Sequence, residues 1–211
     1  MNWIIALIRW IFGIKEGGVS PGSSNTSSGN LENLLIALEG SSNALYSDPI
    51  GLDTIGVGHL VIKNDVNLVK IAGTEDPRFL RSNPLANSQV RALLALDLQK
   101  FRDFVRGFSW DLDAHQEDAL VSFIFNVGTG SFNKSTMKKY LEGKATAVSI
   151  AEQFPRWRMA GGQVMGGLQL RRAVEATIFL GKRQISEYFM KEVPTRHQRR
   201  AQDLVNLYWG G

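Results

Sequence analysis

The sequence contains no cysteine and only three histidines in 211 residues. The absence of cysteine excludes disulfide bonds, thiolate metal sites and a cysteine nucleophile. The histidines, His59, His115 and His197, show no metal-ligand spacing, so we do not expect a metal enzyme. The sequence also lacks a glycine-rich phosphate loop followed by lysine, a serine nucleophile elbow and an internal repeat. We therefore do not expect an enzyme that uses a cysteine nucleophile, a metal site, a phosphate-binding loop of this type or a serine nucleophile elbow.

The length of the chain indicates how large a core it can form, and its net charge indicates which kind of partner it can bind. The chain is 44% hydrophobic and 21% charged, and it is long enough for one compact core or for two small lobes that share a helix. Its formal net charge is +4 and its pI is near 9.4. This charge favours anionic partners such as nucleic acid, acidic cell-wall polymers or phospholipid, without choosing among them.

The N-terminal part differs from the rest of the chain. Residues 1–14, MNWIIALIRWIFGI, are almost wholly apolar, but as a helix they would extend only about 20 Å, against roughly 30 Å for the core of a bilayer. Arg9 lies inside this run and no basic residue precedes it, which argues against a cleaved signal peptide. Residues 17–30 are rich in Gly, Ser and Asn and predict a flexible linker. We therefore expect a domain boundary near residue 30, with one domain over 31–211.

Hydrophobic periodicity predicts a small sheet followed by a mostly helical half. Residues 44–63 are typical of an antiparallel sheet, and residues 72–84 of a loop or a broken helix. We expect Asn30 and Asn87 to cap helices. The predicted helices cover residues 31–39, 88–105, 114–127, 136–141, 147–157 and 171–179. The second of these is long enough to link two lobes, so we expect an α+β, mainly helical fold.

Three polar residues in the segment 38–59, LEGSSNALYSDPIGLDTIGVGH, suggest a site. Glu39 ends an apolar helical pattern, and Asp48 and Thr54 follow in a glycine-studded turn. Taken singly, they are typical of an exposed glutamate, a turn aspartate and a strand threonine. The negative end of the helix dipole and partly apolar surroundings would disfavour the ionised form of Glu39, as a general acid requires. We expect the three side chains to line one concave corner.

The spacing of these residues resembles the catalytic segment of the phage-type lysozymes, glycoside hydrolase family 24. In that family a Glu, an Asp nine positions later and a Thr six positions after the Asp form the active site, as Glu39, Asp48 and Thr54 do here. Further resemblance lies in TIGVGH from Thr54, in FNVGTGSFNKST over 125–136 and in RWRMAGGQVMGGLQLRRAVEATIF over 156–179. It covers roughly residues 31–181 and leaves a C-terminal extension outside. The implied fold is lysozyme-like, with a small antiparallel sheet lobe and a helical lobe joined by a long helix.

The resemblance also implies a reaction. A lysozyme of this kind is an endolysin that hydrolyses the β-1,4 bond between N-acetylmuramic acid and N-acetylglucosamine in peptidoglycan, without a metal or organic cofactor. Glu39 would protonate the leaving glycosidic oxygen. Asp48 would stabilise oxocarbenium-like charge or help to activate water, and Thr54 would position that water, with inversion at the sugar.

Other residues gain roles only through the resemblance. It implies that Asn126 and Phe132 contact substrate, although their periodicity alone favours core positions. It implies that Arg171 contacts Glu39. Without the resemblance, Arg171 could be an exposed surface arginine. It also implies that His59 pairs with Asp97 of the long helix and so stabilises the fold. Without the resemblance, His59 would be an ordinary core or strand histidine.

Two other functions and several partners remain open at this point. A lytic transglycosylase would share the fold but need no water, and a wall-binding, membrane-perturbing protein would need no catalysis. We expect peptidoglycan strands as the partner, no nucleic acid, and a monomer made in the cytoplasm of the host bacterium that acts on the cell wall. Residues 1–14 and 195–209 are candidates for contact with the inner membrane or with lipopolysaccharide, although residues 195–209 also fit a packed terminal helix.

Overall fold

The structure, a computed structural model, describes residues 27–48 and 51–210. The predicted apolar segment 1–14 and most of the predicted linker lie outside these residues. The linker prediction is wrong at its end, because residues 27–30 already belong to the helix α2 (Ser27–Glu39). Asn30 therefore lies inside this helix and does not cap it.

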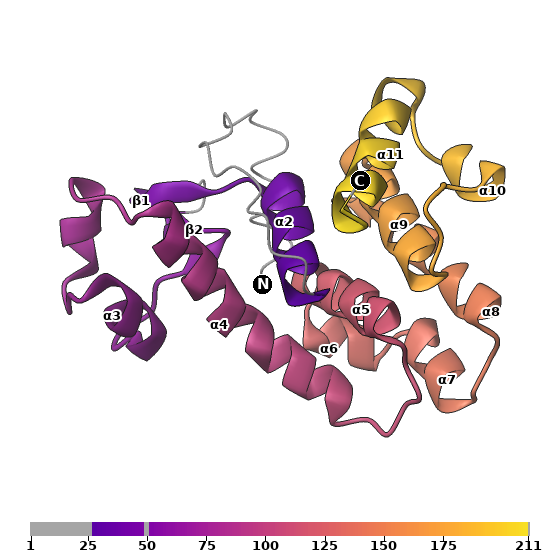
Figure 1. Cartoon of the computed structure of the whole chain (residues 1–211), viewed down its shortest axis with the longest axis horizontal. Coiled ribbons are helices and arrows are strands. Elements are labelled where there is room, and N and C mark those ends of the chain that lie inside the picture. Colours follow the sequence, from indigo (N-terminus) through magenta and orange to yellow (C-terminus); the bar gives the residue numbers. More distant parts are fainter. Residues whose placement is uncertain (1–26, 49–50, 211) are drawn as a thin grey trace.

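Two groups of elements lie toward opposite ends of the long helix α4 (Asn87–Arg106), as Figure 1 shows. The α+β, mainly helical architecture predicted from the sequence is confirmed. The first group comprises β1 (Ser42–Ser47), β2 (Asp53–Gly56), β3 (His59–Leu60), α3 (Val66–Ala72) and the 3-10 helix η1 (Pro77–Arg81). The second group begins with α5 (Ala114–Val127), α6 (Thr129–Asn133), α7 (Thr136–Glu142), α8 (Ala147–Ala151) and the 3-10 helix η2 (Phe154–Trp157). It continues with β4 (Met159–Ala160), β5 (Gln163–Val164), α9 (Gly166–Phe179), α10 (Glu187–Met190) and α11 (Thr195–Tyr208).

The predicted sheet is antiparallel, with the strand order β1-β2-β3. Tyr46 of β1 pairs with Thr54, and Ile55 of β2 pairs with His59. Buried and exposed residues do not alternate along β2, because Thr54, Ile55 and Gly56 are all buried. The sheet therefore lies against the rest of the protein, where β2 and β3 both contact α4.

The helix α4 has the apolar stripe that its sequence predicts. Its buried side chains repeat at helical spacing and include Val90, Leu94, Leu98 and Phe101. The predicted cap is wrong, since the N-cap is Ala86, whose N–H donates to Gln89 Oε1 at 2.8 Å. The stripe packs against both groups of elements, so α4 fixes the sheet relative to the helical lobe.

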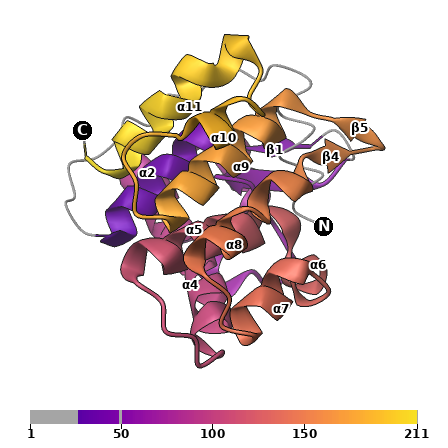
Figure 2. The same ribbon diagram turned by 90° about the vertical axis from the view of Figure 1, so that its right-hand side faces the viewer.

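The helical lobe is built around α5 and α9, which pack against each other. The helix α5 is buried from Asp118 to Val127, as expected for a central helix, and α9 is buried from Leu170 to Phe179. The helix α11 packs against both α9 and α2, and α2 also contacts α5 (Figure 2). The C-terminal segment therefore supports the helix that ends at Glu39.

The packing of α11 decides between the two alternatives for the C-terminal residues 195–209. Its apolar side chains Ala201, Leu204, Val205 and Tyr208 are buried in the core. They are not available for insertion into a membrane, so the packed terminal helix is the correct alternative for residues 195–209. Within residues 27–48 and 51–210, every helix is too short or too polar to cross a membrane.

Candidate active site

Glu39 is the last residue of α2, where the chain turns toward the sheet. Gly40 follows with a φ of 70°, a left-handed conformation that suits glycine, and its N–H donates to the carbonyl of Ile36 at 2.9 Å. The helix is held in place because Leu34 and Leu35 are buried in the core. The side chain of Glu39 is only 7% exposed, so its carboxylate is buried at the end of a fixed helix.

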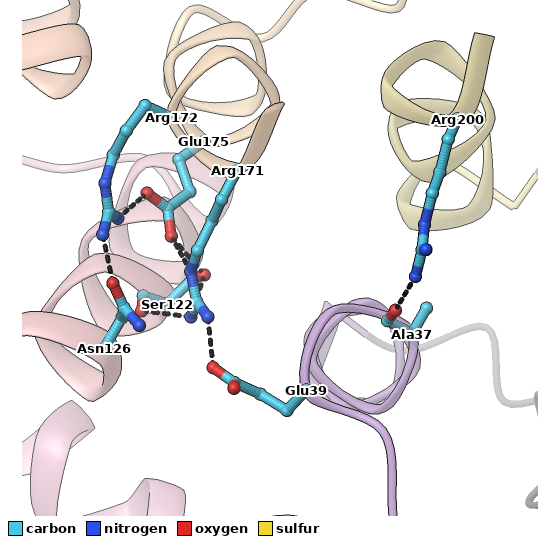
Figure 3. Close-up of polar contacts among 8 residues, drawn as sticks. All are labelled: Ala37, Glu39, Ser122, Asn126, Arg171, Arg172, Glu175 and Arg200. Atoms are coloured by element: carbon cyan, nitrogen blue, oxygen red, sulfur yellow. Dashed lines mark hydrogen bonds and ion pairs between the residues drawn. The ribbon is translucent and has the colours of Figure 1, made fainter. Parts of the chain in front are cut away.

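Arg171 of α9 forms an ion pair with the carboxylate of Glu39, as the resemblance implied (Figure 3). Its buried guanidinium also donates from Nε to Glu175 Oε1 at 2.9 Å and from Nη2 to the carbonyl of Ser122 at 3.0 Å. Burial alone would lower the pKa of Arg171, but Glu39 and Glu175 outweigh burial and raise this pKa. The structure thus places this cation against Glu39, and the role of Glu39 as general acid remains a prediction.

Asp48 and Thr54 are joined through the backbone of Leu52. The N–H of Leu52 donates to Asp48 Oδ1 at 2.7 Å, and its carbonyl accepts from the N–H of Asp48 at 2.8 Å and from Thr54 Oγ1 at 3.3 Å. These bonds bring the two side chains into one turn and hold the Asp48 carboxylate in place. Thr54 is fully buried in this structure. Its contact with Leu52 is structural, and its role toward water remains a prediction.

Asn126 and Trp157 line a cavity of about 230 Å³ in the helical lobe. Arg172 reaches the same cavity, donates from Nη2 to the carboxamide oxygen of Asn126, and donates from Nε to the carbonyl of Trp157 at 3.1 Å. The other lining residues are Val127, Ser131, Met159 and Leu168. Asn126 thus lies beside open space with its oxygen already bonded, and a sugar contact from it remains a prediction.

Phe132 does not have the exposure that a substrate contact requires. Its side chain is fully buried, and its ring makes edge contacts with Phe104 and Trp110 at centroid distances of 6.1 Å and with Phe123 at 6.4 Å. The aromatic side chain contributes its apolar area to the core of the helical lobe. The expectation of substrate binding by Phe132 is therefore wrong for this structure.

Glu175 is a site residue that the sequence analysis missed. It is fully buried, and its two carboxylate oxygens contact Arg171 and Arg172 (Figure 3). The spacing of i,i+4 and i,i+3 along one helix is the signal that could have identified it. Ser122 of α5 supports it, because its hydroxyl donates to Glu175 Oε1 at 2.7 Å.

His59 and Asp97 form the predicted pair, with Nδ1 and Oδ2 at 2.7 Å. The structure adds Asp65, the N-cap of α3, whose Oδ2 lies 2.8 Å from His59 Nε2. Burial alone would lower the pKa of His59, but the hydrogen bonds and charges of Asp97 and Asp65 outweigh burial and raise it. The His59 contacts connect β3, α3 and α4, so they stabilise the sheet lobe.

The carboxylate groups of the described residues do not assemble into a metal site. No cluster of three or more His, Cys, Asp or Glu side chains that could hold a metal ion occurs within residues 27–48 and 51–210.

Comparisons with known proteins identify the family of this chain. The family described as Phage lysozyme matches residues 36–175. An endolysin of Bacillus phage PZA is 44% identical over 92 residues, which cover 43% of this chain but only 35% of that relative. The SAR-endolysin of Enterobacteria phage P21 is 30% identical over 149 residues, which cover 70% of this chain and 80% of that one. A solved structure of a P22 lysozyme mutant is 29% identical with a TM-score of 0.58, and the match covers 77% of this chain and 99% of that chain. The chain therefore belongs to the phage lysozyme family.

Proposed function

We propose that the protein is an endolysin that hydrolyses the β-1,4 bond between N-acetylmuramic acid and N-acetylglucosamine in bacterial peptidoglycan and so lyses the host cell. The observation that carries this proposal is the buried Glu39 at the fixed end of α2, held by Arg171. Family membership supports the same reaction. The positive net charge of +4 favours binding to an acidic wall polymer.

Each of the three residues has one step in the proposed reaction. Glu39 donates a proton to the glycosidic oxygen as the bond to the leaving sugar breaks. Asp48, held by the N–H of Leu52, is the negative charge that stabilises the oxocarbenium-like sugar, and its carboxylate accepts the proton that the attacking water loses. Thr54 orients the water that attacks the opposite face of the sugar, which gives inversion. An inverting enzyme places its two carboxyl groups roughly 6.5 to 9.5 Å apart, and we expect Glu39 and Asp48 to lie in this range.

Mass spectrometry of digested peptidoglycan tests this reaction against its enzymatic alternative. Hydrolysis produces muramic acid residues with reducing ends, because water supplies the new hydroxyl. Lytic transglycosylation produces anhydro-muramic ends, because the sugar's own hydroxyl replaces water. We expect reducing ends, and a product mixture made up of anhydro ends would show that Thr54 does not position water for attack.

We further propose that the protein is made in the host cytoplasm, acts on the wall and contacts the inner membrane or lipopolysaccharide through residues 1–14. The apolar composition of this segment supports the proposal, and so does the likeness to a relative named a SAR-endolysin. Exposed arginines of α11, Arg196 and Arg199, are a second candidate for contact with an anionic surface.

Flotation with anionic liposomes separates these two contacts in the full-length chain. Ile5→Lys with Ile8→Lys should abolish flotation, because charge is costly inside an apolar membrane segment. Arg196→Gln with Arg199→Gln is the matched pair on α11 and should weaken flotation only at low salt. Unchanged flotation of the Ile5 and Ile8 double variant would contradict contact through residues 1–14.

A further inference from the structure

Glu175 lies at the centre of a buried network of four charged side chains. Its Oε1 accepts from Arg171 Nε at 2.9 Å, and its Oε2 accepts from Arg172 Nη1. Arg171 then contacts Glu39, and Arg172 contacts Asn126 (Figure 3). One carboxylate therefore holds both arginines, and the two arginines point to the proposed acid and to the wall of the cavity.

The charges in this network balance. Two carboxylates, Glu39 and Glu175, face two guanidiniums, Arg171 and Arg172. A buried charge is tolerated only when it is paired, so each arginine needs the carboxylate between them. Burial and Arg171 together lower the pKa of Arg172, which shows that the two cations oppose each other. Without Glu175, both would act on Glu39 as the one remaining carboxylate of the network.

We propose that Glu175 is a positioning residue for the reaction: it fixes Arg171 against Glu39 and Arg172 against Asn126, and it offsets enough positive charge for Glu39 to carry a proton. The inference rests on the proposed role of Glu39 as general acid. An acid that faced two unbalanced cations would lose its proton at lower pH and would be inactive near neutrality.

The other charged groups near α2 have separate partners. Arg200 of α11 donates to the carbonyl of Ala37 at 3.0 Å, close to the end of the helix (Figure 3). His197 of α11 lies beside Gly166 at the start of α9, and its pKa is lowered by burial and by its arginine neighbours. On α5, Asp118 forms an ion pair with Arg102 of α4. Arg91 and Arg102 of α4 act on Glu32, which lies near the middle of α2. The α9 network, through Arg171, places a charged partner in direct contact with Glu39.

The test is the pH dependence of kcat/KM on solubilised peptidoglycan, which reports the ionisation of the acid in the free enzyme. Glu175→Gln removes one negative charge and keeps the shape of the side chain. We expect the alkaline limb of its profile to move to lower pH by about one unit, with activity at acidic pH largely retained. Arg172→Gln removes a positive charge and should move the same limb to higher pH, with a raised KM because Asn126 loses its partner.

Ser122→Ala is the matched variant without a change of charge. It removes the hydroxyl that donates to Glu175 Oε1 at 2.7 Å, so it should lower the melting temperature but leave the limb in place. If folded Glu175→Gln shows the wild-type limb, Glu175 is only structural and the proposal is wrong. If Glu175→Gln does not fold, the charge-balanced variant Glu175→Gln with Arg172→Gln takes its place and is compared with Arg172→Gln alone. We expect its limb to lie below that of Arg172→Gln, because Arg171 has lost the carboxylate that offset its charge. A limb equal to that of Arg172→Gln overturns the proposal.

Failure of this proposal and failure of the proposed function are distinguishable. An active Glu39→Gln variant would contradict the general-acid role itself, whatever the limb does. An inactive Glu39→Gln variant together with an unmoved limb in Glu175→Gln would contradict only the role of Glu175.

Discussion

His59 of β3 and Asp97 of α4 are in direct contact, with 2.7 Å between Nδ1 and Oδ2. The other ring nitrogen of His59 lies 2.8 Å from Asp65 Oδ2. A neutral imidazole has only one N–H, so it can donate to only one of these two carboxylates, whereas the imidazolium ion donates to both. The geometry therefore favours the charged form of His59 and links the sheet to the long helix through it.

The stability of the protein should depend on pH through His59. Its pKa is raised in the folded state, so its contribution is full below the ordinary value of 6.5 and is lost as the pH rises through the folded-state value. Asp97→Asn removes one of the two carboxylates and should cost about 1–3 kcal/mol at pH 6. It should also flatten the alkaline limb of a plot of melting temperature against pH. A limb as steep as that of wild type would show that the pair contributes no pH-dependent stability.

Asp65 should act in the opposite sense under acid. Burial alone would raise its pKa, but the N–H of Leu68 and the ring of His59 outweigh burial and lower it. Its contribution is therefore present above the ordinary value of 3.8 and is lost as the pH falls through the folded-state value. Asp65→Asn keeps an N-cap side chain for α3 but loses the charge. We therefore expect thermal unfolding to show a smaller loss of stability than in wild type as the pH falls below 3.8. Glu187→Gln at the exposed start of α10 is the control and should leave the curve unchanged.

Thr54→Val tests the proposed water position. The side chain is fully buried and its hydroxyl makes one long bond of 3.3 Å to Leu52, so the variant should fold and lose only about 1 kcal/mol of stability. Activity should fall by about 10²-fold or more because the hydrolytic water loses its partner. Thr54→Ser keeps the hydroxyl and should retain most activity. Wild-type turnover in Thr54→Val would contradict the role of Thr54 in positioning water and would leave it as a structural residue of β2.

Tyr208→Phe tests whether the C-terminal helix belongs to the core. Tyr208 of α11 donates to Asp118 Oδ2 at 2.9 Å, and Asp118 is fully buried. Loss of this bond should cost about 1–3 kcal/mol in unfolding by urea, since a buried charged acceptor loses a donor. Activity below the melting transition should stay near that of wild type. Tyr188→Phe on an exposed surface is the control, and equal stability of the two variants would contradict a core role for α11.

The sequence predicted best what depends on local spacing. The apolar stripe of α4 and the end of α5 at Gly128 follow from helical periodicity, and the structure has both. The ion pair between Glu39 and Arg171 joins residues 132 positions apart, so no local pattern contains it, and only the family resemblance implied it. The contacts of Asp65 and Glu175 could have been found locally, because Asp65 begins a helix and Glu175 follows two arginines at helical spacing.

Two outcomes could not be predicted from the sequence because burial depends on tertiary packing. Phe132 lies in a segment that resembles a substrate cleft, but neighbouring aromatic rings enclose it. The pattern of α11, basic and then apolar, fits a membrane surface or a protein core equally well, and only the position of α2 and α9 decides between them. The spacing of apolar residues along a helix shows which face is buried, but it does not identify what covers that face.

The rate at which Glu39→Gln releases reducing muramic ends from purified peptidoglycan tests the central claim most directly. Glutamine keeps the size of the side chain and a hydrogen-bond acceptor for Arg171, but it cannot donate the proton. With circular dichroism confirming a folded variant at the assay temperature, we expect the rate to fall by at least about 10²-fold while binding to the peptidoglycan persists. Release at the wild-type rate would contradict general-acid catalysis by Glu39.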